Sequence, residues 1–403
     1  MYIERELGKK IKKYLKIREI LAIIGPRQSG KTTLINHLIE GLPKTNKITL
    51  EDVRTLTLFE QDLKTFINIH IKPYDYVFID EIQYSKQSGK NLKYIYDTCE
   101  TKLLISGSSA TEISIHSIKF LVGRIFIYQL YPLSFSEFLK YKNENIYNLI
   151  KEGHITEEVT KKTKPFLDEF MIYGGYPRVV LAQTIEEKKD VLKYIYNTYL
   201  LKEIKEILQL QEDYKLIQLI NALALQIGGV INYNELAQIS GYNYSEIKKY
   251  LNILEKTFIC MTLRNYSKNK RTELIKSPKI FFYDTGFRNE IIKNYILENN
   301  DKGKIYENFV FAELIKKDYI PKYWRTKAKA EVDFIIEEAN EVIPLEVKSS
   351  LSNISRSFRS FLDTYHPKKA IYISTARKNK NLIGKTEIKY ITFEEIINIK
   401  NNL

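Results

Sequence analysis

The sequence predicts an α/β protein of several domains, and three observations along its 403 residues support that prediction. A short apolar run, Ile20–Ile24, leads into a glycine-rich loop, after which apolar residues recur at helical spacing. A second apolar run, Tyr76–Ile79, is followed by two acidic residues. Near the carboxyl end, charged residues alternate with apolar ones at strand periodicity. The first two features predict a parallel sheet with a ligand site at one edge, and the third predicts a separate α/β domain.

The loop after the first strand fits the phosphate-binding pattern G-x-x-x-x-G-K-[ST] at every required position. Its glycines let backbone N–H groups turn inward at a helix start, where they bind anions. Lys31 can reach the β and γ phosphates, and the Thr32 hydroxyl can bind Mg²⁺. The strand–loop–helix context favours ATP binding over a plain glycine turn. The residues expected to contact the nucleotide are Gly25, Pro26, Arg27, Gln28, Ser29, Gly30, Lys31, Thr32 and Thr33.

The second apolar run ends in Asp80 and Glu81. In a parallel sheet this strand tip lies beside the phosphate loop, so Asp80 can hold Mg²⁺ and Glu81 can orient the attacking water. A strand with a charged exit turn would be the preferred interpretation if these acids stood alone. The phosphate loop in the same chain favours a shared ATP and Mg²⁺ site.

Composition sets the broad class. Hydrophobic residues make up 44% of the chain and charged residues 28%, as in ordinary soluble globular proteins. No apolar run approaches the ~20 residues needed to span a bilayer, and the charged amino terminus lacks a secretory signal. Cys99 and Cys260 lie far apart without metal-ligand spacing. These features predict a cytoplasmic protein without a membrane partner, and the net charge of +14 weakly favours a polyanionic one.

Several further segments resemble those of a known protein family. Ser106 and Ser108 follow the third apolar strand, and the chain continues through Gly123-Arg124 to Pro132-Leu-Ser-Phe and Gly174-Gly-Tyr-Pro-Arg178. Together with the phosphate loop and the Asp-Glu-Ile-Gln segment, these resemble AAA+-type P-loop ATPases of archaea and bacteria. The resemblance covers nearly the whole chain and implies an AAA+-type parallel sheet followed by a helical lid.

The resemblance also implies roles for single residues. Ser106 or Ser108 would sense the γ-phosphate. Arg124 would be an arginine finger for the nucleotide of a neighbouring subunit in a homo-oligomer, although an ion-paired structural arginine is the competing interpretation. In the ATPases that it resembles, a Gly-x-Pro segment of the lid contacts the nucleotide. Gly175–Pro177 matches it, and Arg178 would then sense phosphate, but a helix-breaking turn explains the segment equally well.

The middle of the chain has the spacing of a winged helix. Two helical segments, 234–240 and 245–254, are joined by a turn at Gly241, and two apolar strands follow. Winged helices bind DNA or contact proteins, so a DNA partner and a protein partner both stay open. The cations that favour DNA lie on the second helix and in the wing between the strands; they are Lys248, Lys249, Arg264, Lys268, Lys270 and Arg271.

The last domain carries a second group of charged residues. Alternate residues of a strand share a face, so Glu346 and Lys348 point together, and Asp333 on the neighbouring strand can converge on them. With Glu307 on the preceding helix, Asp-x12-Glu-x-Lys resembles the PD-(D/E)xK core of restriction-endonuclease-like domains. That resemblance implies that Glu307, Asp333 and Glu346 hold Mg²⁺ while Lys348 polarises water or phosphate. A salt-bridged strand edge is the alternative.

The complete prediction is a P-loop ATPase domain over residues 1–160, a helical lid over 161–212, a winged helix over 213–290 and a nuclease-like domain over 291–403. The leading function is ATP hydrolysis on or with DNA, and nuclease activity in the last domain stays open. The alternative is a nucleotide-switched regulatory or scaffold protein whose nuclease-like domain cleaves nothing. The predicted catalytic residues are Glu81, Arg124, Asp333, Glu346 and Lys348.

Overall fold

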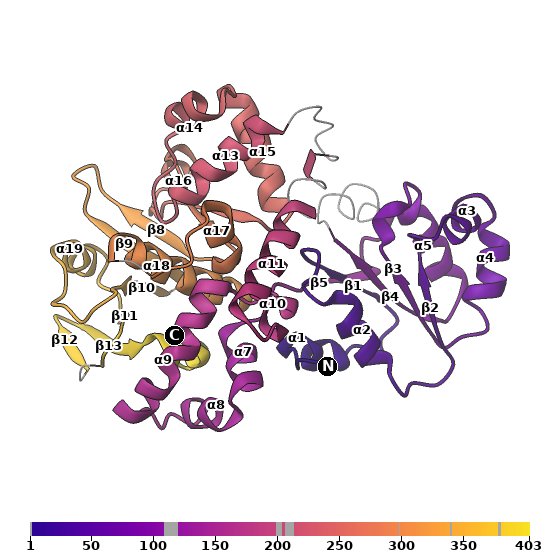
Figure 1. Ribbon diagram of the computed structural model, residues 1–403, viewed down its shortest axis with the longest axis horizontal. Helices are drawn as coiled ribbons and strands as arrows, with labels where there is room; N and C mark the ends of the chain where they lie inside the picture. Colours follow the sequence, from indigo (N-terminus) through magenta and orange to yellow (C-terminus); the bar gives the residue numbers. More distant parts are fainter. Residues whose placement is uncertain are drawn as a thin grey trace. The chain divides into compact units, whose positions relative to one another are not determined.

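The computed structural model describes residues 2–108, 120–198, 204–205, 213–297, 299–338, 341–377 and 380–403 (Figure 1). The chain divides into two compact units. The first comprises Met1–Leu133 with Lys256–Phe258, and the second comprises Ser134–Glu255 with Ile259–Leu403. Residues 199–203 and 206–212 of the predicted helical lid lie outside the described residues. No helix in the described part of the chain is long and apolar enough to cross a membrane.

The first unit is built on a five-stranded sheet in the order β2-β3-β4-β1-β5, and all four pairings are parallel, as predicted. Strand β1, which lies between β4 and β5, is buried along its whole length. The strands are β1 Ile20–Ile24, β2 Thr45–Thr49, β3 Tyr76–Asp80, β4 Lys102–Gly107 and β5 Ile125–Gln129. The helices are α1 Glu6–Lys12, α2 Lys31–Ile39, α3 Val53–Gln61, α4 Leu63–His70 and α5 Ser88–Thr98, with a 3₁₀ turn η1 at Ile82–Tyr84.

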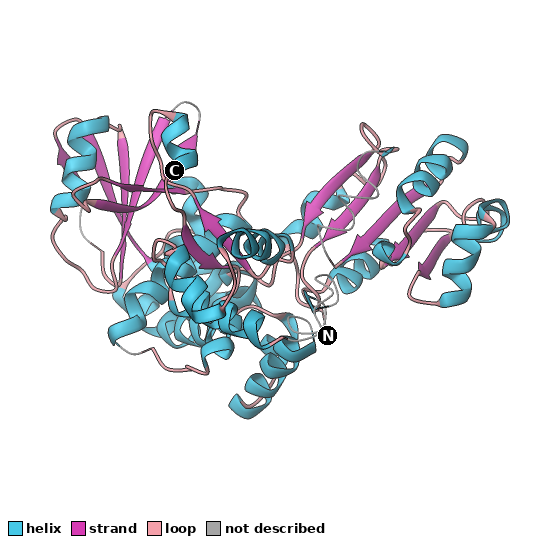
Figure 2. Cartoon of the chain, turned by 90° about the horizontal axis from the view of Figure 1, so that it is seen from above, coloured by secondary structure: helices cyan, strands magenta, loops and turns pink. Residues whose placement is uncertain are grey.

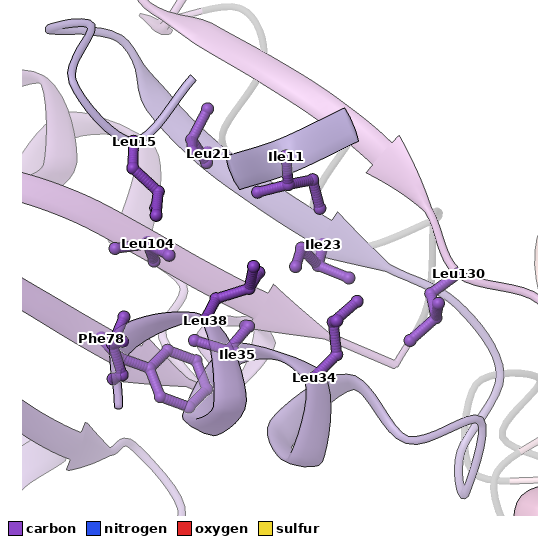
Figure 3. Packing of buried hydrophobic residues seen from close by; sticks show 11 residues of the cluster. Ile11, Leu15, Leu21, Ile23, Leu34, Ile35, Leu38, Phe78, Leu104 and Leu130 are labelled. Carbon is purple, nitrogen blue, oxygen red and sulfur yellow. The ribbon is translucent and has the colours of Figure 1, made fainter. Parts of the chain in front are cut away.

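Helix α2 lies on this sheet through an apolar stripe. Leu34, Ile35 and Leu38 are spaced so that they fall on one face of the helix, and all three are buried (Figure 3). They join a core cluster with Leu21 and Ile23 of β1. Each buried aliphatic side chain of this size stabilises the fold by about 1.5–3 kcal/mol. Because α2 begins at Lys31, this packing also fixes the direction in which the phosphate loop leaves β1.

The second unit begins at Ser134. It includes helices α7 and α8, which fall within residues 1–160 of the predicted ATPase domain, and that boundary stays a prediction. Buried contacts attach these helices to the second unit. The backbone N–H of Phe135 donates to Glu313 Oε2 at 3.0 Å, and Asn398 Nδ2 donates to the carbonyl of Ile150 at 2.7 Å. The helices at its start are α7 Phe135–Lys142, α8 Glu144–Lys151, α9 Glu157–Tyr173, α10 Pro177–Leu181 and α11 Ile185–Ile195.

The Gly-Gly-Tyr-Pro segment is a packed turn between α9 and α10. Gly174 ends α9 at φ 76°, and a Cβ there would lie 2.0 Å from Asp284 Oδ1. The N–H of Gly175 donates to Asp284 Oδ2 at 2.7 Å, and Tyr176 is fully buried. This packing accounts for the segment as a helix-breaking turn. Arg178 is exposed and lies over the ring of Tyr194 at 5.6 Å, so its contact with nucleotide stays a prediction.

The middle of the second unit follows the order of elements that a winged helix has. Asn232 caps α14, Gly241 ends it at φ 69°, and α15 follows after a short turn. Strands β6 and β7 pair antiparallel, with Cys260 opposite Phe282. The segment between these strands contains a helix, α16. The elements are α13 Tyr214–Leu225, α14 Tyr233–Ser240, α15 Tyr244–Lys256, β6 Cys260–Leu263, α16 Lys270–Ile275, β7 Lys279–Phe282 and α17 Thr285–Ile292.

The carboxyl-terminal part contains a six-stranded mixed sheet in the order β12-β13-β11-β10-β9-β8 (Figure 2). Strands β9 and β10 are antiparallel, with Leu345 opposite Phe334, so Glu346 and Asp333 lie opposite each other at the next position. The strands are β8 Lys322–Arg325, β9 Glu331–Glu338, β10 Glu341–Val347, β11 Lys369–Ser374, β12 Asn381–Ile383 and β13 Thr386–Thr392. The helices are α18 Asn299–Lys316, α19 Arg356–Tyr365, α20 Ile399–Asn402 and the 3₁₀ helix η4 Phe393–Asn398.

Candidate functional site

The phosphate loop connects β1 to α2, and its path depends on glycine. A Cβ at Gly25 would lie 2.1 Å from the carbonyl oxygen of Leu130, so no larger residue fits there. Gly30 caps α2 at φ 92°, a conformation that glycine adopts without strain. Gln28 also has a positive φ of 60°. These turns bring the loop to the start of α2, where N–H groups without a helical partner favour an anion.

Lys31 and Thr32 take up the positions that the motif predicts. Lys31 is buried, and its ammonium donates to the carbonyls of Gly25 and Pro26, each at 3.0 Å. Thr32 Oγ1 donates to Asp80 Oδ2 at 2.9 Å, which joins the first turn of α2 to the tip of β3. All nine predicted contact residues lie in the loop or the first turn of α2.

The donor set of this site fits a nucleotide with Mg²⁺. The hydroxyl of Thr32 and the carboxylate of Asp80 are hard oxygen ligands of the kind that Mg²⁺ prefers. Within the loop, Ser29 Oγ and Gln28 Oε1 are buried and have no hydrogen-bond partner among the described residues. Because buried polar atoms are nearly always paired, these two atoms suit a polar ligand.

A hydrogen-bonded chain surrounds the two acidic residues of β3. Asp80 Oδ1 accepts from Ser106 Oγ, and the N–H of Glu81 lies 3.3 Å from the same hydroxyl. Glu81 has a left-handed backbone conformation, φ 54°, which is uncommon outside glycine and recurs at functional sites. Gln83 Nε2 donates to Glu81 Oε2 and to Ser108 Oγ, the latter at 3.1 Å. Both predicted sensor serines therefore contact this chain.

Two residues of this site were not predicted. Gln83 belongs to the Asp-Glu-Ile-Gln segment, but the sequence did not predict a role for it. Its position two residues after Glu81 was the one sequence feature that pointed to a contact with that carboxylate. Arg5 is 5% exposed and donates to the carbonyl of Ser29 at 2.7 Å and to that of Tyr131 at 2.6 Å. No local pattern marks Arg5, because its partners lie 24 and 126 residues away.

Arg124 lies at the other end of the strands. The N–H of Ile20 donates to its carbonyl, and Ile20 is the first residue of β1. The four residues of β1 after Ile20 span about 13 Å, so Arg124 is well removed from the phosphate loop of its own chain. Its Nε pairs with Asp97 Oδ1 at 2.9 Å. The ion-paired interpretation thus describes Arg124 within the chain, and a role at a neighbouring subunit stays a prediction.

In the second unit, the predicted carboxyl-terminal residues come together. Lys348 Nζ lies 2.7 Å from Glu346 Oε1 and 3.7 Å from Asp333 Oδ2. The N–H of Val347 donates to Asp333 Oδ2 at 2.8 Å, and Ser355 Oγ donates to Glu346 Oε1 at 3.1 Å. Glu346 Oε2 is buried without a hydrogen-bond partner among the described residues. Burial and the nearby Asp333 raise the pKa of Glu346 to about 7.

A second lysine, Lys279 of β7, belongs to this cluster and was not predicted. It is 1% exposed, and its Nζ lies 2.5 Å from Glu331 Oε1. Burial lowers the pKa of Lys279, but the carboxylates of Glu307, Asp333 and Glu331 outweigh that effect and raise it overall. Burial raises the pKa of Glu307 to about 8. A lysine at the start of an apolar strand gives no sequence signal for a buried ion pair.

The assignment of Glu307, Asp333 and Glu346 as metal ligands stays a prediction. Within the described ranges, no group of three or more His, Cys, Asp or Glu side chains could hold a metal ion. In this structure the ammonium of Lys348 lies near the carboxylates of both Asp333 and Glu346.

Comparison with known families identifies the class of the first unit. Residues 17–139 match a family model described as an AAA domain. Residues 164–296 and 302–395 match two models described as domains of unknown function, DUF8612 and DUF4143. The chain therefore contains an AAA-type P-loop ATPase domain followed by two domains of other families.

The relatives resemble the chain over most of its length. It is 26% identical over 394 residues to an uncharacterized protein of Haemophilus influenzae, covering 92% of this chain and 93% of that protein. It is also 26% identical over 357 residues to an uncharacterized protein of Methanocaldococcus jannaschii, covering 85% and 78%. Among solved structures, a Walker-type ATPase of Pyrococcus abyssi is 14% identical with a TM-score of 0.47, covering 72% of this chain and 96% of that one. A TM-score of 0.47 does not establish the fold of this chain. The fold of the first unit is instead established by the five-stranded parallel sheet described above.

The contacts of Arg5 lead to a prediction. Arg5→Gln should raise the Kd for ATP about 10- to 150-fold, because the loop loses the hydrogen bond from a charged donor to the carbonyl of Ser29, and such a bond contributes about 1.5–3 kcal/mol. Nucleotide titration by calorimetry measures this change. Arg18→Gln is the matched control, since Arg18 is exposed and bonds to the carbonyl of Tyr96. Arg5→Lys should recover part of the affinity. An unchanged Kd in a folded Arg5→Gln protein would remove Arg5 from the site.

Proposed function

We propose that this protein binds ATP together with Mg²⁺ and hydrolyses it. The observation that supports this most strongly is the 2.9 Å contact from Thr32 to Asp80, with Glu81 adjacent at the same strand tip. Mg²⁺, when bound, neutralises charge on the β and γ phosphates. Thr32 and Asp80 would hold it.

The other residues of the site supply binding and proton handling. The loop N–H groups and Lys31 would bind the phosphates, with the Lys31 ammonium exchanging its carbonyl partners for phosphate oxygens. Glu81 would orient the attacking water and accept its proton. Gln83 restrains Glu81 Oε2, so it sets the direction in which this carboxylate faces. Ser106 and Ser108, linked to Asp80 and Gln83, would report the presence of the γ-phosphate.

We also infer that the second unit brings this ATPase to DNA. Lys248 and Lys249 of α15 are exposed, and the net charge of +14 favours a polyanion. The wing supports this less than the sequence suggested. Lys270 pairs with Glu337 at 3.1 Å, and Lys268 lies 5.2 Å from the ring centre of Tyr365. Arg124 would complete a neighbouring subunit's site if the protein forms a homo-oligomer.

For the carboxyl-terminal domain, a specific observation favours the alternative of a nuclease-like fold that cleaves nothing. Lys279 and Lys348 both pair with the acidic residues that a metal-dependent nuclease would use as ligands or neighbours. Buried carboxylates paired with ammonium groups have less affinity for a divalent cation, because the cation must displace an existing partner. We infer that this cluster of paired lysines and carboxylates stabilises the domain. The protein would then act as a regulator or scaffold, and nucleotide binding would control that role.

Glu81→Gln tests the ATPase proposal. The variant should bind ATP as the wild type does, since the amide keeps the shape of the carboxylate, and its hydrolysis rate should fall at least 100-fold, as expected for loss of a general base. Phosphate release and nucleotide titration measure the two effects. Glu100→Gln, an exposed acid of the same unit, should hydrolyse ATP normally. Normal turnover in Glu81→Gln would contradict the role given to Glu81.

The carboxyl-terminal proposal is tested with supercoiled plasmid DNA in Mg²⁺ or Mn²⁺. The full chain should leave the plasmid intact, with or without ATP, because the carboxylates are already paired with lysines. Gel electrophoresis measures nicking and linearisation. Metal-dependent cleavage that disappears in Asp333→Ala while ATP hydrolysis persists would establish an active nuclease and overturn this proposal.

A further inference from the structure

A groove of about 630 Å³ lies in the second unit among α14, α15 and the segment that connects β6 to β7. Residues from all three elements line it, and they include Asn232, Tyr233, Tyr244, Lys248, Arg264 and Lys276. Its volume falls in the range of sites that bind small molecules or parts of polymers. Neither the proposed ATPase chemistry nor the acid–lysine cluster uses these residues.

The groove is positively charged. Lys248 and Arg264 are exposed, and neither has an ion pair with any described residue. Glu273 is the one acidic residue among the described lining residues, and its charge is compensated. Lys322 Nζ lies 3.0 Å from Glu273 Oε2, and Lys270 Nζ lies 3.4 Å from Oε1. Lys248 and Arg264 therefore favour an anionic ligand such as a phosphate.

The same groove presents aromatic and aliphatic surface. Tyr244 is 52% exposed and packs edge-on against Tyr233, with ring centres 5.0 Å apart. Lys248 Nζ lies 4.4 Å from the ring centre of Tyr244. Leu274 and Ile275 of α16 also line the groove and are 69% and 75% exposed. Aromatic rings beside cations are the features with which proteins bind unpaired bases and their phosphates.

The wing beside the groove is held in place by the carboxyl-terminal sheet. Asn265 forms a β-bridge with Tyr323, and the N–H of Tyr266 donates to the carbonyl of Tyr323 at 2.5 Å. Lys276 Nζ donates to the carbonyl of Arg325 at 2.7 Å. These contacts leave the wing little freedom to enter a groove of duplex DNA. They also hold one wall of the groove in place against the sheet.

We propose that this groove binds a single-stranded segment of nucleic acid, with a phosphate on Lys248 and Arg264 and a base stacked on Tyr244. Single strands are favoured over duplexes because the base faces of a duplex are already stacked and cannot contact an aromatic side chain. The proposal rests on the inferred DNA partner of the second unit, and it specifies where the strand binds and in which form.

The test uses the full chain with a fluorescein-labelled oligothymidine of twenty nucleotides, measured by fluorescence anisotropy at several salt concentrations. Lys248→Glu and Arg264→Glu should each raise Kd at least tenfold, and each loss of a phosphate contact should reduce the slope of log K against log salt by about 0.7. Tyr244→Leu should raise Kd at least fivefold without changing that slope, and Tyr244→Trp should restore binding. Lys256→Glu is the matched control, since Lys256 is an exposed lysine of the same helix that does not line the groove.

The outcomes distinguish an error in the assignment of the groove from an error in the proposed DNA partner. Equal losses in Lys248→Glu and Lys256→Glu, or tighter binding of a duplex of the same length, would overturn the assignment of the strand to this groove. Preferential binding of an oligoglutamate peptide would overturn it in favour of an acidic protein partner. If the wild type binds the oligonucleotide but the groove variants do so equally well, only the groove is wrong. If the wild type binds no DNA while hydrolysing ATP, the DNA partner is wrong as well.

Discussion

The hydrogen bond from Thr32 to Asp80 is the contact on which the nucleotide site depends. In the strand order β3-β4-β1, β4 separates the strand that leads into the phosphate loop from the strand that ends in Asp80. Ser106 at the end of β4 donates a hydrogen bond to Asp80 and so contacts the tip of β3 from the strand that lies between β3 and β1. The loop, Asp80 and Ser106 thus meet at the carboxyl edge of three adjacent strands. Packing of α2 on the same strands holds Thr32 in register with Asp80.

The parts of this site that could be predicted are those encoded by consecutive residues. The phosphate loop and the acids of β3 each occupy a short segment whose spacing determines local geometry, and the parallel sheet then brings the segments together. Arg5 could not be predicted, because its partners are distant in sequence. They are also backbone carbonyls, which every residue has, so no residue type marks them in the sequence. The division between the compact units after Leu133 has no local sequence signal for a similar reason. It depends on Glu313, a buried carboxylate far along the chain that accepts from the backbone of Phe135.

The carboxyl-terminal cluster shows where strand periodicity is sufficient and where it is not. It predicted that Asp333, Glu346 and Lys348 would meet, and they do. It could not predict Lys279, which comes from β7 of the preceding domain and pairs with Glu331. Removing one partner of a buried ion pair costs about 3–5 kcal/mol, so Lys279 ties the two domains together within the second unit. The charge of the carboxyl-terminal cluster is therefore set partly by the domain that precedes it.

The central claim is that Thr32 and Asp80 together form the cation site of an ATP-binding loop. Its most direct test is the affinity for ATP with and without Mg²⁺, in the wild type and in Asp80→Asn. We expect Mg²⁺ to tighten ATP binding by the wild type and to have little effect on Asp80→Asn, while binding without Mg²⁺ stays the same in both. An Asp80→Asn protein whose affinity responds to Mg²⁺ as the wild type does would contradict this account.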